Sequence, residues 1–428
     1  MREMKDSGIE WIGEIPEDWI TSKVLYLLKM PITDGPHVTP KLYNEGIPFI
    51  SAEAISDGKI NFDHKRGFIS KRFHDICCIK YTPKKNDIYM VKSGATTGRV
   101  AMVESDAIFN IWSPLAVFRA NGRKIFPKFL YYSLISPSFL RQVQNNWSYG
   151  TQENIGMRML EKLKLCLPSL AEQIRIANYL DQKCSEIDAI TKDIQVQIDT
   201  LEQYKRSVIT EAVTKGLDPG VEMKDSGIAW IGTMPSHWKC IRGKYILTYL
   251  QKPVRKNDTV ITCFRDGEVT LRSNRREDGF TISQKEIGYQ GIDEGDLIVH
   301  GMDGFAGAIG ISDSRGKASP VLNVLDSIQN KRYIMYYLRS MAYSNVFLAI
   351  ATGIRVRSCD LRWNKLAELF YPVPPLQEQK RIVEYIDETL AKTDHVIRAK
   401  QNQLSTLSDY KKSLIYEYVT GKKEVPAE

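Results

Sequence analysis

The chain has 428 residues, about three times the roughly 150 residues of an average domain, so it should fold into several domains rather than one. Its composition, with 43% hydrophobic residues, 26% charged residues, 28 glycines and 18 prolines, is that of a globular protein and excludes a disordered or fibrous chain. Lysine and arginine number 59 against 51 acidic residues, and the net charge of +8 is compatible with a polyanionic partner such as nucleic acid.

Features that the sequence lacks exclude further classes of protein. No apolar run approaches the roughly 18–20 residues of a membrane span, and the first residues lack the apolar core of a secretion signal. We therefore expect a cytoplasmic protein with no membrane contact. The seven cysteines form no C-x-x-C pair and the six histidines have no ligand spacing, so neither a disulfide framework nor a metal site is predicted.

The N-terminal segment, residues 4–19, begins an internal repeat. Its sequence MKDSGIEWIGEIPEDW returns at residues 223–238 as MKDSGIAWIGTMPSHW, with 11 of 16 positions identical. Two later segments also return 206 positions further on, residues 167–182 at 373–388 and residues 201–214 at 407–420. Matched segments separated by dissimilar ones predict two copies of one fold. We expect variable globular domains at 1–167 and 218–372, followed by constant segments at 168–217 and 373–428.

Each variable segment is predicted to be a mixed α/β domain. The first contains strand-like runs at 47–51 and 87–91, and helical stretches are expected near 127–139 and 330–347. Arginine on a short loop can grip phosphate or fork onto guanine, so basic residues beside turns are candidate DNA contacts, although a solvated surface would have the same composition. These residues are Lys65, Arg66, Lys71, Arg72, Lys92 and Arg99 in the first segment and Arg255, Lys256, Arg272, Arg275, Arg276, Arg355 and Arg357 in the second.

The constant segments carry an apolar stripe that repeats every 3.5 residues, which predicts coiled-coil helices. In the first segment the stripe consists of Leu170, Ile174, Ala177, Leu180, Cys184, Ile187, Ile190, Ile194, Ile198, Leu201, Tyr204, Val208 and Ala212. Pro168 and Glu172 mark the helix start and Gly216 its end, so its length is on the order of 65 Å. A single stripe would suit an ordinary core helix, but two matched helices predict an antiparallel coiled coil with one domain near each end.

Motifs for catalysis are missing from the sequence. The nearest candidate for a nucleotide loop, residues 310–318, has the wrong glycine spacing and ends in Ala318 where a magnesium-binding Ser or Thr would stand. No dinucleotide fingerprint, no Asn/Asp-Pro-Pro-aromatic run and no clear catalytic set is present. The turn SGATTG at 93–98 could bind phosphate, or its glycines could serve turn geometry alone. The chain is therefore predicted to bind rather than to react.

Taken together, the motifs resemble the specificity (S) subunits of type I restriction-modification enzymes. The matching segments cover nearly the whole chain: residues 4–19, GIPFIS at 46–51, SGATTG at 93–98, GTQENI at 150–155, LPSLAEQ with its partner VPPLQEQ, and YEYVTGKKEV near the end. The resemblance implies an α+β protein with two α/β target-recognition domains, each reading one half of a bipartite DNA site. It also implies that two long antiparallel helices hold the domains apart and set the spacer.

The resemblance further implies partners and site residues. The partners would be double-stranded DNA, two modification subunits that carry S-adenosylmethionine, and two restriction subunits that use ATP and magnesium, so this chain is expected to be non-catalytic and to bind none of these cofactors. In the first domain the resemblance adds four residues to the candidate DNA contacts: Ser93, Thr151, Gln152 and Asn154. The second domain departs from the family pattern, because residues 351–358 lack the GTQENI form. An adenine-methyltransferase-type enzyme and a coiled-coil interaction scaffold remain as alternatives.

Overall fold

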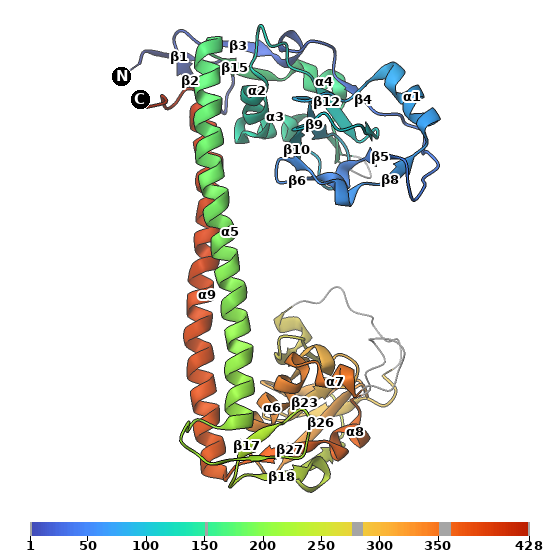
Figure 1. Ribbon diagram of the computed structural model, residues 1–428, viewed down its shortest axis with the longest axis vertical. Coiled ribbons are helices and arrows are strands. Elements are labelled where there is room, and N and C mark those ends of the chain that lie inside the picture. Colours follow the sequence, from blue (N-terminus) through green and yellow to red (C-terminus); the bar gives the residue numbers. More distant parts are fainter. Residues whose placement is uncertain (1, 150–152, 276–285, 351–360, 427–428) are drawn as a thin grey trace. The chain divides into compact units, whose positions relative to one another are not determined.

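The computed structural model describes residues 2–149, 153–275, 286–350 and 361–426 (Figure 1). The chain divides into two compact units, Met1–Ile194 together with Asn402–Glu428, and Gln195–Gln401. Each unit therefore contains one globular α/β domain and a part of each of the two long helices, α5 (Leu170–Lys215) and α9 (Leu376–Val419).

The domain of the first unit is built around a four-stranded antiparallel sheet with the order β10-β9-β12-β4. Every residue of the two central strands is buried, which explains why both are continuous apolar runs. The strands of this sheet are β4 (Thr33–Asp34), β9 (Ile88–Val91), β10 (Val100–Met102) and β12 (Leu115–Phe118). A second sheet has the order β11-β5-β8, from β5 (Ile47–Ile50), β8 (Gly67–Ile69) and β11 (Asn110–Ile111).

Helices and short hairpins complete this domain. Proline is the first residue of both α2 and α3, where its missing N–H costs no helical hydrogen bond. The helices are α1 (Lys71–Lys80), α2 (Pro127–Ile135), α3 (Pro137–Asn146) and α4 (Met157–Lys162). The remaining strands are β1 (Met4–Asp6), β2 (Glu14–Pro16), β3 (Ile20–Lys23), β6 (Ile55–Ser56), β7 (Lys59–Ile60), β13 (Ser148–Tyr149), β14 (Glu153–Asn154) and β15 (Lys164–Leu167).

The domain of the second unit repeats the central sheet, with the order β19-β26-β23-β24. The side chain of Asn330 caps its main helix by accepting from the backbone N–H groups of Arg332 and Tyr333. The strands are β16 (Met223–Asp225), β17 (Thr233–Pro235), β18 (Lys239–Arg242), β19 (Leu247–Leu250), β20 (Ile261–Cys263), β21 (Val269–Leu271), β22 (Gln290–Ile292), β23 (Leu297–His300), β24 (Ile309–Ile311), β25 (Gly316–Ala318), β26 (Leu322–Ser327) and β27 (Phe370–Val373). The helices are α6 (Lys331–Tyr343), α7 (Val346–Ala349) and α8 (Trp363–Glu368).

The two domains share one frame and differ in their insertions. Both contain the same four-stranded order, an N-terminal hairpin (β1–β2 and β16–β17), and a pairing of an early strand with the last strand before the long helix (β3–β15 and β18–β27). The first domain adds the sheet β11-β5-β8, whereas the second adds the pairs β20–β21 and β22–β25. Within the described residues, the predicted duplication of an α/β fold with rewritten middle segments is confirmed.

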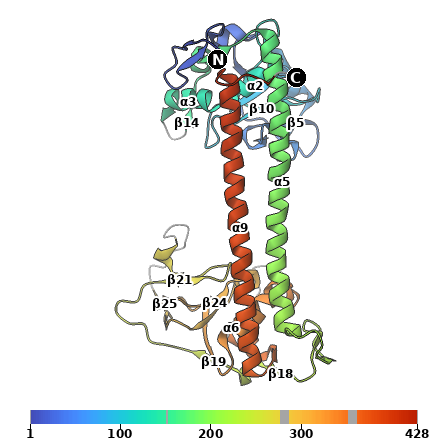
Figure 2. The same cartoon turned by 90° about the vertical axis from the view of Figure 1, so that its left-hand side faces the viewer.

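The long helices pair antiparallel in both units (Figure 2). In the first unit Lys411 Nζ donates to Asp188 Oδ1 at 2.5 Å, and in the second Lys205 Nζ donates to Asp394 Oδ1 at 2.6 Å. The repeat offset of 206 relates Asp188 to Asp394 and Lys205 to Lys411. The two ion pairs are therefore copies of one contact in which the helices exchange roles, as the predicted antiparallel pairing requires.

The repeated N-terminal motif fixes the start of each long helix. Trp19 Nε1 donates to Glu172 Oε2 at 3.2 Å, and Trp238 Nε1 donates to Glu378 Oε1 at 3.1 Å. Both indoles are buried, and both carboxylates lie in the first helical turn, where the helix dipole favours negative charge. This contact explains why the Trp at the end of each motif recurs with a Glu of the constant segment.

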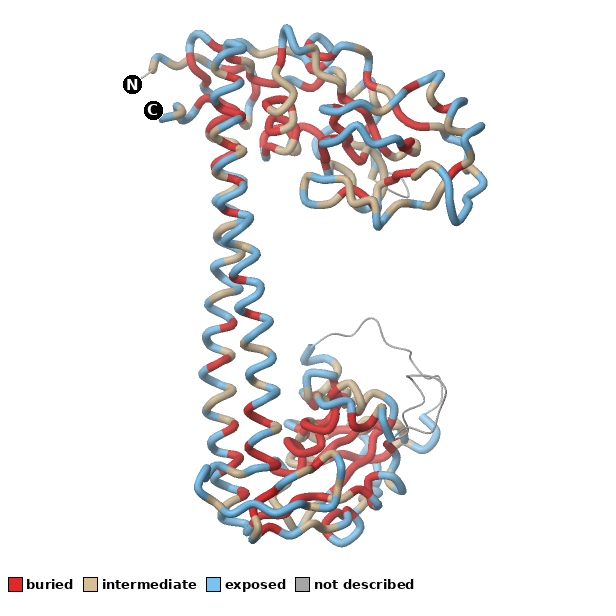
Figure 3. The backbone as a smooth tube through the Cα atoms, viewed as in Figure 1, coloured by how far each residue is buried: buried red, intermediate tan, exposed pale blue. Residues whose placement is uncertain are grey.

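The predicted stripe is buried at most of its positions, including Ile194 and Ile198 in the middle of α5, and is exposed at a few. Ile176, Ala177, Leu180, Cys184 and Ile187 of α5 share one buried cluster with the end of α9. Figure 3 shows the buried residues concentrated in the domain sheets and on the helix stretches that pack against them. Four stripe positions are exposed, Leu170, Ile174, Ile190 and Tyr204, by 37%, 38%, 48% and 48%.

Candidate DNA interface

In the first unit the structure brings together two motifs that are far apart in the sequence, the turn 93–98 after β9 and the hairpin β13–β14. The backbone N–H of Gly94 donates to the carbonyl of Glu153 at 3.0 Å, and the N–H of Ile155 donates to the carbonyl of Lys92 at 2.9 Å. The two loops therefore form one surface where β9 of the central sheet ends.

Two of the predicted contact residues meet on this surface. Ser93 and Asn154 are partners in an isolated antiparallel bridge. The predicted contacts Thr151 and Gln152 lie outside the described residues. The SGATTG and GTQENI motifs, which the sequence presents separately, thus belong to one place in the fold.

A hollow of about 600 Å³ lies beside the turn. Arg99 is exposed and lines this hollow, together with the carboxylate-bearing Asp57 and the indole of Trp147. A cation, a carboxylate and an aromatic surface in one hollow can meet a phosphate, a base edge and a sugar at the same time. The sequence did not single out Asp57 or Trp147, because neither is basic nor part of a recognised motif.

Lys92 has a different environment from Arg99. Its side chain is only 13% exposed, and its Nζ lies 3.3 Å from Oδ2 of the buried Asp34. Lys80 also pairs with Asp34, and although burial opposes ionisation, the two lysines hold the pKa of this carboxyl below its usual value. The Lys92 charge is therefore compensated inside the domain, which favours a role in supporting the turn.

Lys65 and Arg66 lie over aromatic rings of the same domain. Lys65 Nζ is 5.0 Å from the ring centroid of Phe68, and the Arg66 guanidinium is 4.7 Å from that of Trp112. Arg66 Nη1 also donates to Glu53 Oε1 at 3.2 Å. Both side chains are held in place by these contacts while part of Arg66, 46% of its side chain, remains open to solvent.

In the second unit the turn that follows β23 occupies the equivalent place. The N–H of Leu361 donates to the carbonyl of Gly301 at 2.9 Å, and Asn323 Nδ2 donates to the carbonyl of Leu361 at 3.0 Å. The turn therefore packs against the chain just before α8, as the turn of the first unit packs against the chain just before α4. Three predicted contacts of this unit, Arg276, Arg355 and Arg357, lie outside the described residues.

Arg275 is engaged by acidic neighbours. Its guanidinium lies 2.6 Å from Asp266 Oδ2 and 3.0 Å from Glu268 Oε2, and it covers the ring of Phe264 at 4.2 Å from the centroid. The hydrogen bond with Asp266 raises the pKa of Arg275 above its usual value. Arg272 lies nearby, with Nε donating to Thr262 Oγ1 at 3.4 Å. The charges of this region are largely balanced.

A hollow of about 640 Å³ in the second unit contains both Arg272 and Arg275, and also Arg265 and His300, which the sequence analysis missed. His300 Nδ1 accepts hydrogen bonds from the backbone N–H groups of Met302 and Asp303, so the neutral ring carries its proton on Nε2. Burial lowers the pKa of His300 and keeps the ring neutral. Its position at the end of the apolar run DLIVH, opposite DIYMV in the repeat, is the signal that could have identified it.

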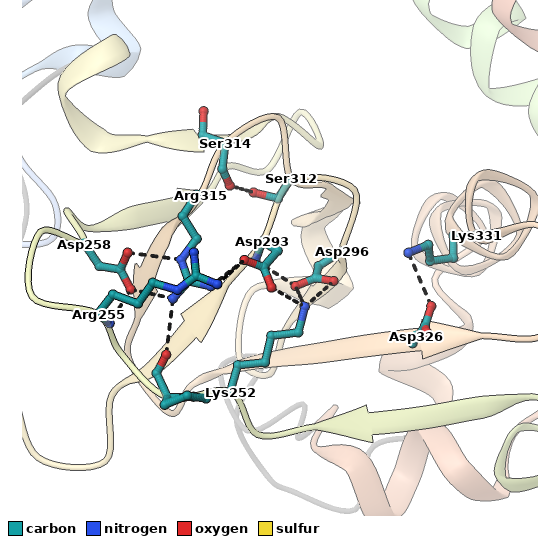
Figure 4. Close-up of polar contacts among 11 residues, drawn as sticks. Lys252, Arg255, Asp258, Asp293, Asp296, Ser312, Ser314, Arg315, Asp326 and Lys331 are labelled. Carbon is teal, nitrogen blue, oxygen red and sulfur yellow. Dashed lines mark hydrogen bonds and ion pairs between the residues drawn. The ribbon is translucent and has the colours of Figure 1, made fainter.

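Arg255 and Lys256 lie on the exposed loop between β19 and β20. The side chain of Arg255 is 69% exposed, and its Nη2 lies 3.9 Å from Asp293 Oδ1. The N–H of Arg255 donates to Asp258 Oδ2 at 2.8 Å, which fixes the loop backbone. Figure 4 shows this loop beside a network of charged residues. Arg99, Arg255 and Lys256 are thus among the predicted contacts that the structure leaves open to solvent, together with Lys71 and Arg72 on α1.

Within the described ranges, no group of three or more His, Cys, Asp or Glu residues is placed to hold a metal ion. No helix in the same part of the chain is both long and apolar enough to cross a membrane.

Comparisons with known proteins agree with the geometry. Residues 30–200 match the family model described as the type I restriction modification DNA specificity domain. A protein of Methanocaldococcus jannaschii named as the MjaX specificity subunit of a type I restriction enzyme is 27% identical over 96% of this chain and 95% of its own length. The MjaVIII specificity subunit of the same organism is 22% identical over 95% of this chain and 93% of its own length. The StySPI specificity subunit of Salmonella potsdam is 22% identical over 96% of this chain and 90% of its own length.

Solved structures share the fold. A chain from a study of complex assembly and conformational transition in the type I R-M system gives a TM-score of 0.67 at 16% identity and covers 96% of this chain and 99% of its own. The HsdS subunit from Thermoanaerobacter tengcongensis gives a TM-score of 0.50 at 16% identity, and the match covers 96% of this chain and 98% of that subunit. Nearly the whole chain thus shares the fold of these solved structures, and residues 30–200 match the type I DNA specificity domain. The predicted resemblance is confirmed, because the chain is similar over nearly its whole length to type I restriction enzyme specificity subunits.

Proposed function

We propose that this chain is the specificity subunit of a type I restriction-modification complex and that each unit reads one half of a bipartite DNA site. The observation that carries the proposal is the repeated frame. In both units the strand at the centre of the sheet leads into a turn that packs against a second loop, with basic side chains around it. Two copies of one binding surface suit a target made of two separate halves.

The two domains differ in their insertions and loops, which supports the proposal that they read different halves of the DNA target. Their central sheets have the same order, whereas the insertions and the loop residues differ. Base edges are read by side chains that enter the grooves, whereas contacts to the phosphate backbone fix position only. Each domain therefore specifies its own half-site.

A domain exchange tests this function. Residues 22–165 are replaced by the corresponding segment of a relative, and the methylated motif is read by modified-base sequencing of a host that carries the complete complex. We expect a new first half-site, with the second half-site and the spacer unchanged. The reciprocal exchange of the second domain is the matched control. A change in both half-sites after either exchange would contradict the proposal.

The helices bear the surface proposed to dock the modification subunits. Exposed apolar residues recur close in sequence to each copy of the ion pair: we assign Ile190 and Tyr410 to the first docking surface, and Val396 and Tyr204 to the second. The repeat offset of 206 relates Ile190 to Val396 and Tyr204 to Tyr410. These four side chains are exposed by 48%, 53%, 40% and 48% in the order named.

Single exposed apolar residues are common on protein surfaces. The same pair exposed at equivalent positions of both copies, in a stripe whose period predicts burial, points to a partner that covers each of them. Two equivalent surfaces support two modification subunits per chain.

In this proposal the chain supplies recognition, and chemistry belongs to its partners. The modification subunits carry S-adenosylmethionine, and two restriction subunits use ATP and magnesium. The complex works on DNA in the cytoplasm. The comparisons do not favour the two alternatives, an adenine-methyltransferase-type enzyme or a coiled-coil scaffold, because the relatives are named as specificity subunits.

A further inference from the structure

The loop between β19 and β20 is held by an arginine that lies outside it. Arg315, between β24 and β25, donates from Nε to Asp258 Oδ1 at 3.1 Å and from Nη2 to Asp258 Oδ2 at 2.8 Å. Its Nη2 also donates to the carbonyl of Pro253 at 3.2 Å, and its Nη1 donates to Asp293 Oδ1. Figure 4 shows this guanidinium between the two carboxylates. Arg315 is only 24% exposed, so its charge is used inside the domain.

The same carboxylates lie beside Arg255. Asp293 Oδ1, the atom that Arg315 occupies, lies 3.9 Å from Arg255 Nη2. Lys252 occupies the other oxygen of Asp293 at 2.9 Å and also pairs with Asp296 at 2.7 Å. The hydrogen bonds from Lys252 and Arg315 lower the pKa of Asp293 to about 2, so this group is a carboxylate at neutral pH.

The network contains one more carboxylate than it has closely paired cations. Three carboxylates, those of Asp258, Asp293 and Asp296, face two engaged cations, those of Lys252 and Arg315. Arg255 is the third cation, and its side chain is 69% exposed. If the Arg315 guanidinium were absent, the Arg255 guanidinium would be the nearest replacement for it at Asp293 Oδ1.

We propose that Arg315 is a positioning residue: it occupies Asp258 and Asp293 and thereby holds the Arg255 guanidinium at 3.9 Å from Asp293 Oδ1, so that its exposed side chain can contact a DNA phosphate. The inference rests on the proposed function. Arg315 itself contacts no DNA, and its effect passes entirely through Arg255. Without Arg315, the Arg255 guanidinium closes from 3.9 Å to hydrogen-bonding distance of Asp293 Oδ1 and no longer reaches its phosphate.

The test uses the full chain in complex with its modification subunits and a duplex that carries the site read from the host's methylated motif. Affinity is measured over a range of salt concentrations, since the slope of log affinity against log salt falls by about 0.9 for each phosphate that the protein no longer neutralises. Arg255→Ala and Arg315→Ala should each reduce the slope by about this amount. The double variant should show no further reduction, because both changes act on the same phosphate.

Rescue distinguishes positioning from a general structural role. Adding Asp293→Asn to Arg315→Ala removes the charge that draws Arg255 inward, so the slope should return to the wild-type value. Asp326→Asn in the same background is the matched control, because Asp326 pairs with Lys331 at 3.3 Å (Figure 4) and interacts with Lys252 of the network but not with Arg255 or Arg315 in the described contacts, so it should give no rescue. Arg315→Lys keeps a cation at Asp293 and should retain the wild-type slope, which provides a readout even if Arg315→Ala does not fold.

The outcomes separate the inference from the proposed function. A wild-type complex without affinity for its methylated motif would refute the function itself. A wild-type slope in folded Arg315→Ala, a further reduction in the double variant, or equal rescue by Asp326→Asn would overturn the role of Arg315 and leave the function intact.

Discussion

Removing one docking surface should remove one modification subunit. In Tyr410→Ala the first docking surface loses its aromatic ring, which is 53% exposed in the chain by itself. A tyrosine buries roughly 150–250 Å² when fully covered, so about 100 Å² remains for a partner to cover. At about 25 cal/mol per Å² this area contributes about 2.5 kcal/mol to binding, which is about a 70-fold weaker Kd for that subunit.

The assay is titration of the chain with purified modification subunit, followed by native mass spectrometry and sedimentation. Wild type should bind two subunits, Tyr410→Ala and Tyr204→Ala should each retain one at concentrations near the wild-type Kd, and the double variant should retain none. Tyr43→Ala is the control, because Tyr43 is 43% exposed but lies in the first domain, outside the long helices. Two subunits bound with unchanged affinity to the double variant would refute the docking surfaces.

Three further predictions concern DNA binding and activity. Arg99→Ala should lower the salt slope of the complex by about 0.9, whereas Arg275→Ala should lower it less because Asp266 and Glu268 already compensate its charge; equal effects in a filter-binding series would contradict this ranking. Inserting four residues within 195–201 of α5 and a matching four within 401–407 of α9 adds about 6 Å to the helix pair. At a rise of roughly 3.4 Å per base pair, the preferred spacer should lengthen by one or two pairs, and an unchanged optimum in a spacer library, with the protein folded, would exclude a ruler. Finally, the chain purified without its partners should neither methylate nor cleave DNA, and turnover by the pure chain would show that it carries a catalytic site of its own.

Local pattern and internal repetition made much of the fold predictable. The spacing of apolar residues predicts helices from period 3.5 and strands from short apolar runs, because backbone geometry places those residues on one face or within one strand. The duplicated motif at 4–19 and 223–238 predicts two copies of one frame, and the sheet orders β10-β9-β12-β4 and β24-β23-β26-β19 confirm it. The motifs also predicted the similarity to type I restriction enzyme specificity subunits that the comparisons find.

The candidate site was predictable only as a set of residue types. From the sequence alone, four basic residues beside turns are equivalent candidates: Lys92, Arg99, Arg255 and Arg275. In the structure Arg99 and Arg255 are open to solvent, whereas Lys92 faces Asp34 and Arg275 is paired with acidic neighbours. The docking surfaces could not be predicted either. The period of the stripe predicts burial for Ile190 and Tyr204 just as it does for Ile187, but only Ile187 is buried.

The sequence by itself thus determined the duplication, the mixed α/β frame and the two long helices, because each depends on the order and spacing of residues along the chain. Tertiary structure alone decided which cations remain available to DNA. The physical reason is that a charge is compensated by whatever lies near it in space: Asp34 and Lys92 are 58 positions apart (92 − 34), and Asp258 and Arg315 are 57 apart. Only folding of the sheets brings such residues within hydrogen-bonding distance, and only that proximity separates a buried ion pair from a cation left free to meet a phosphate.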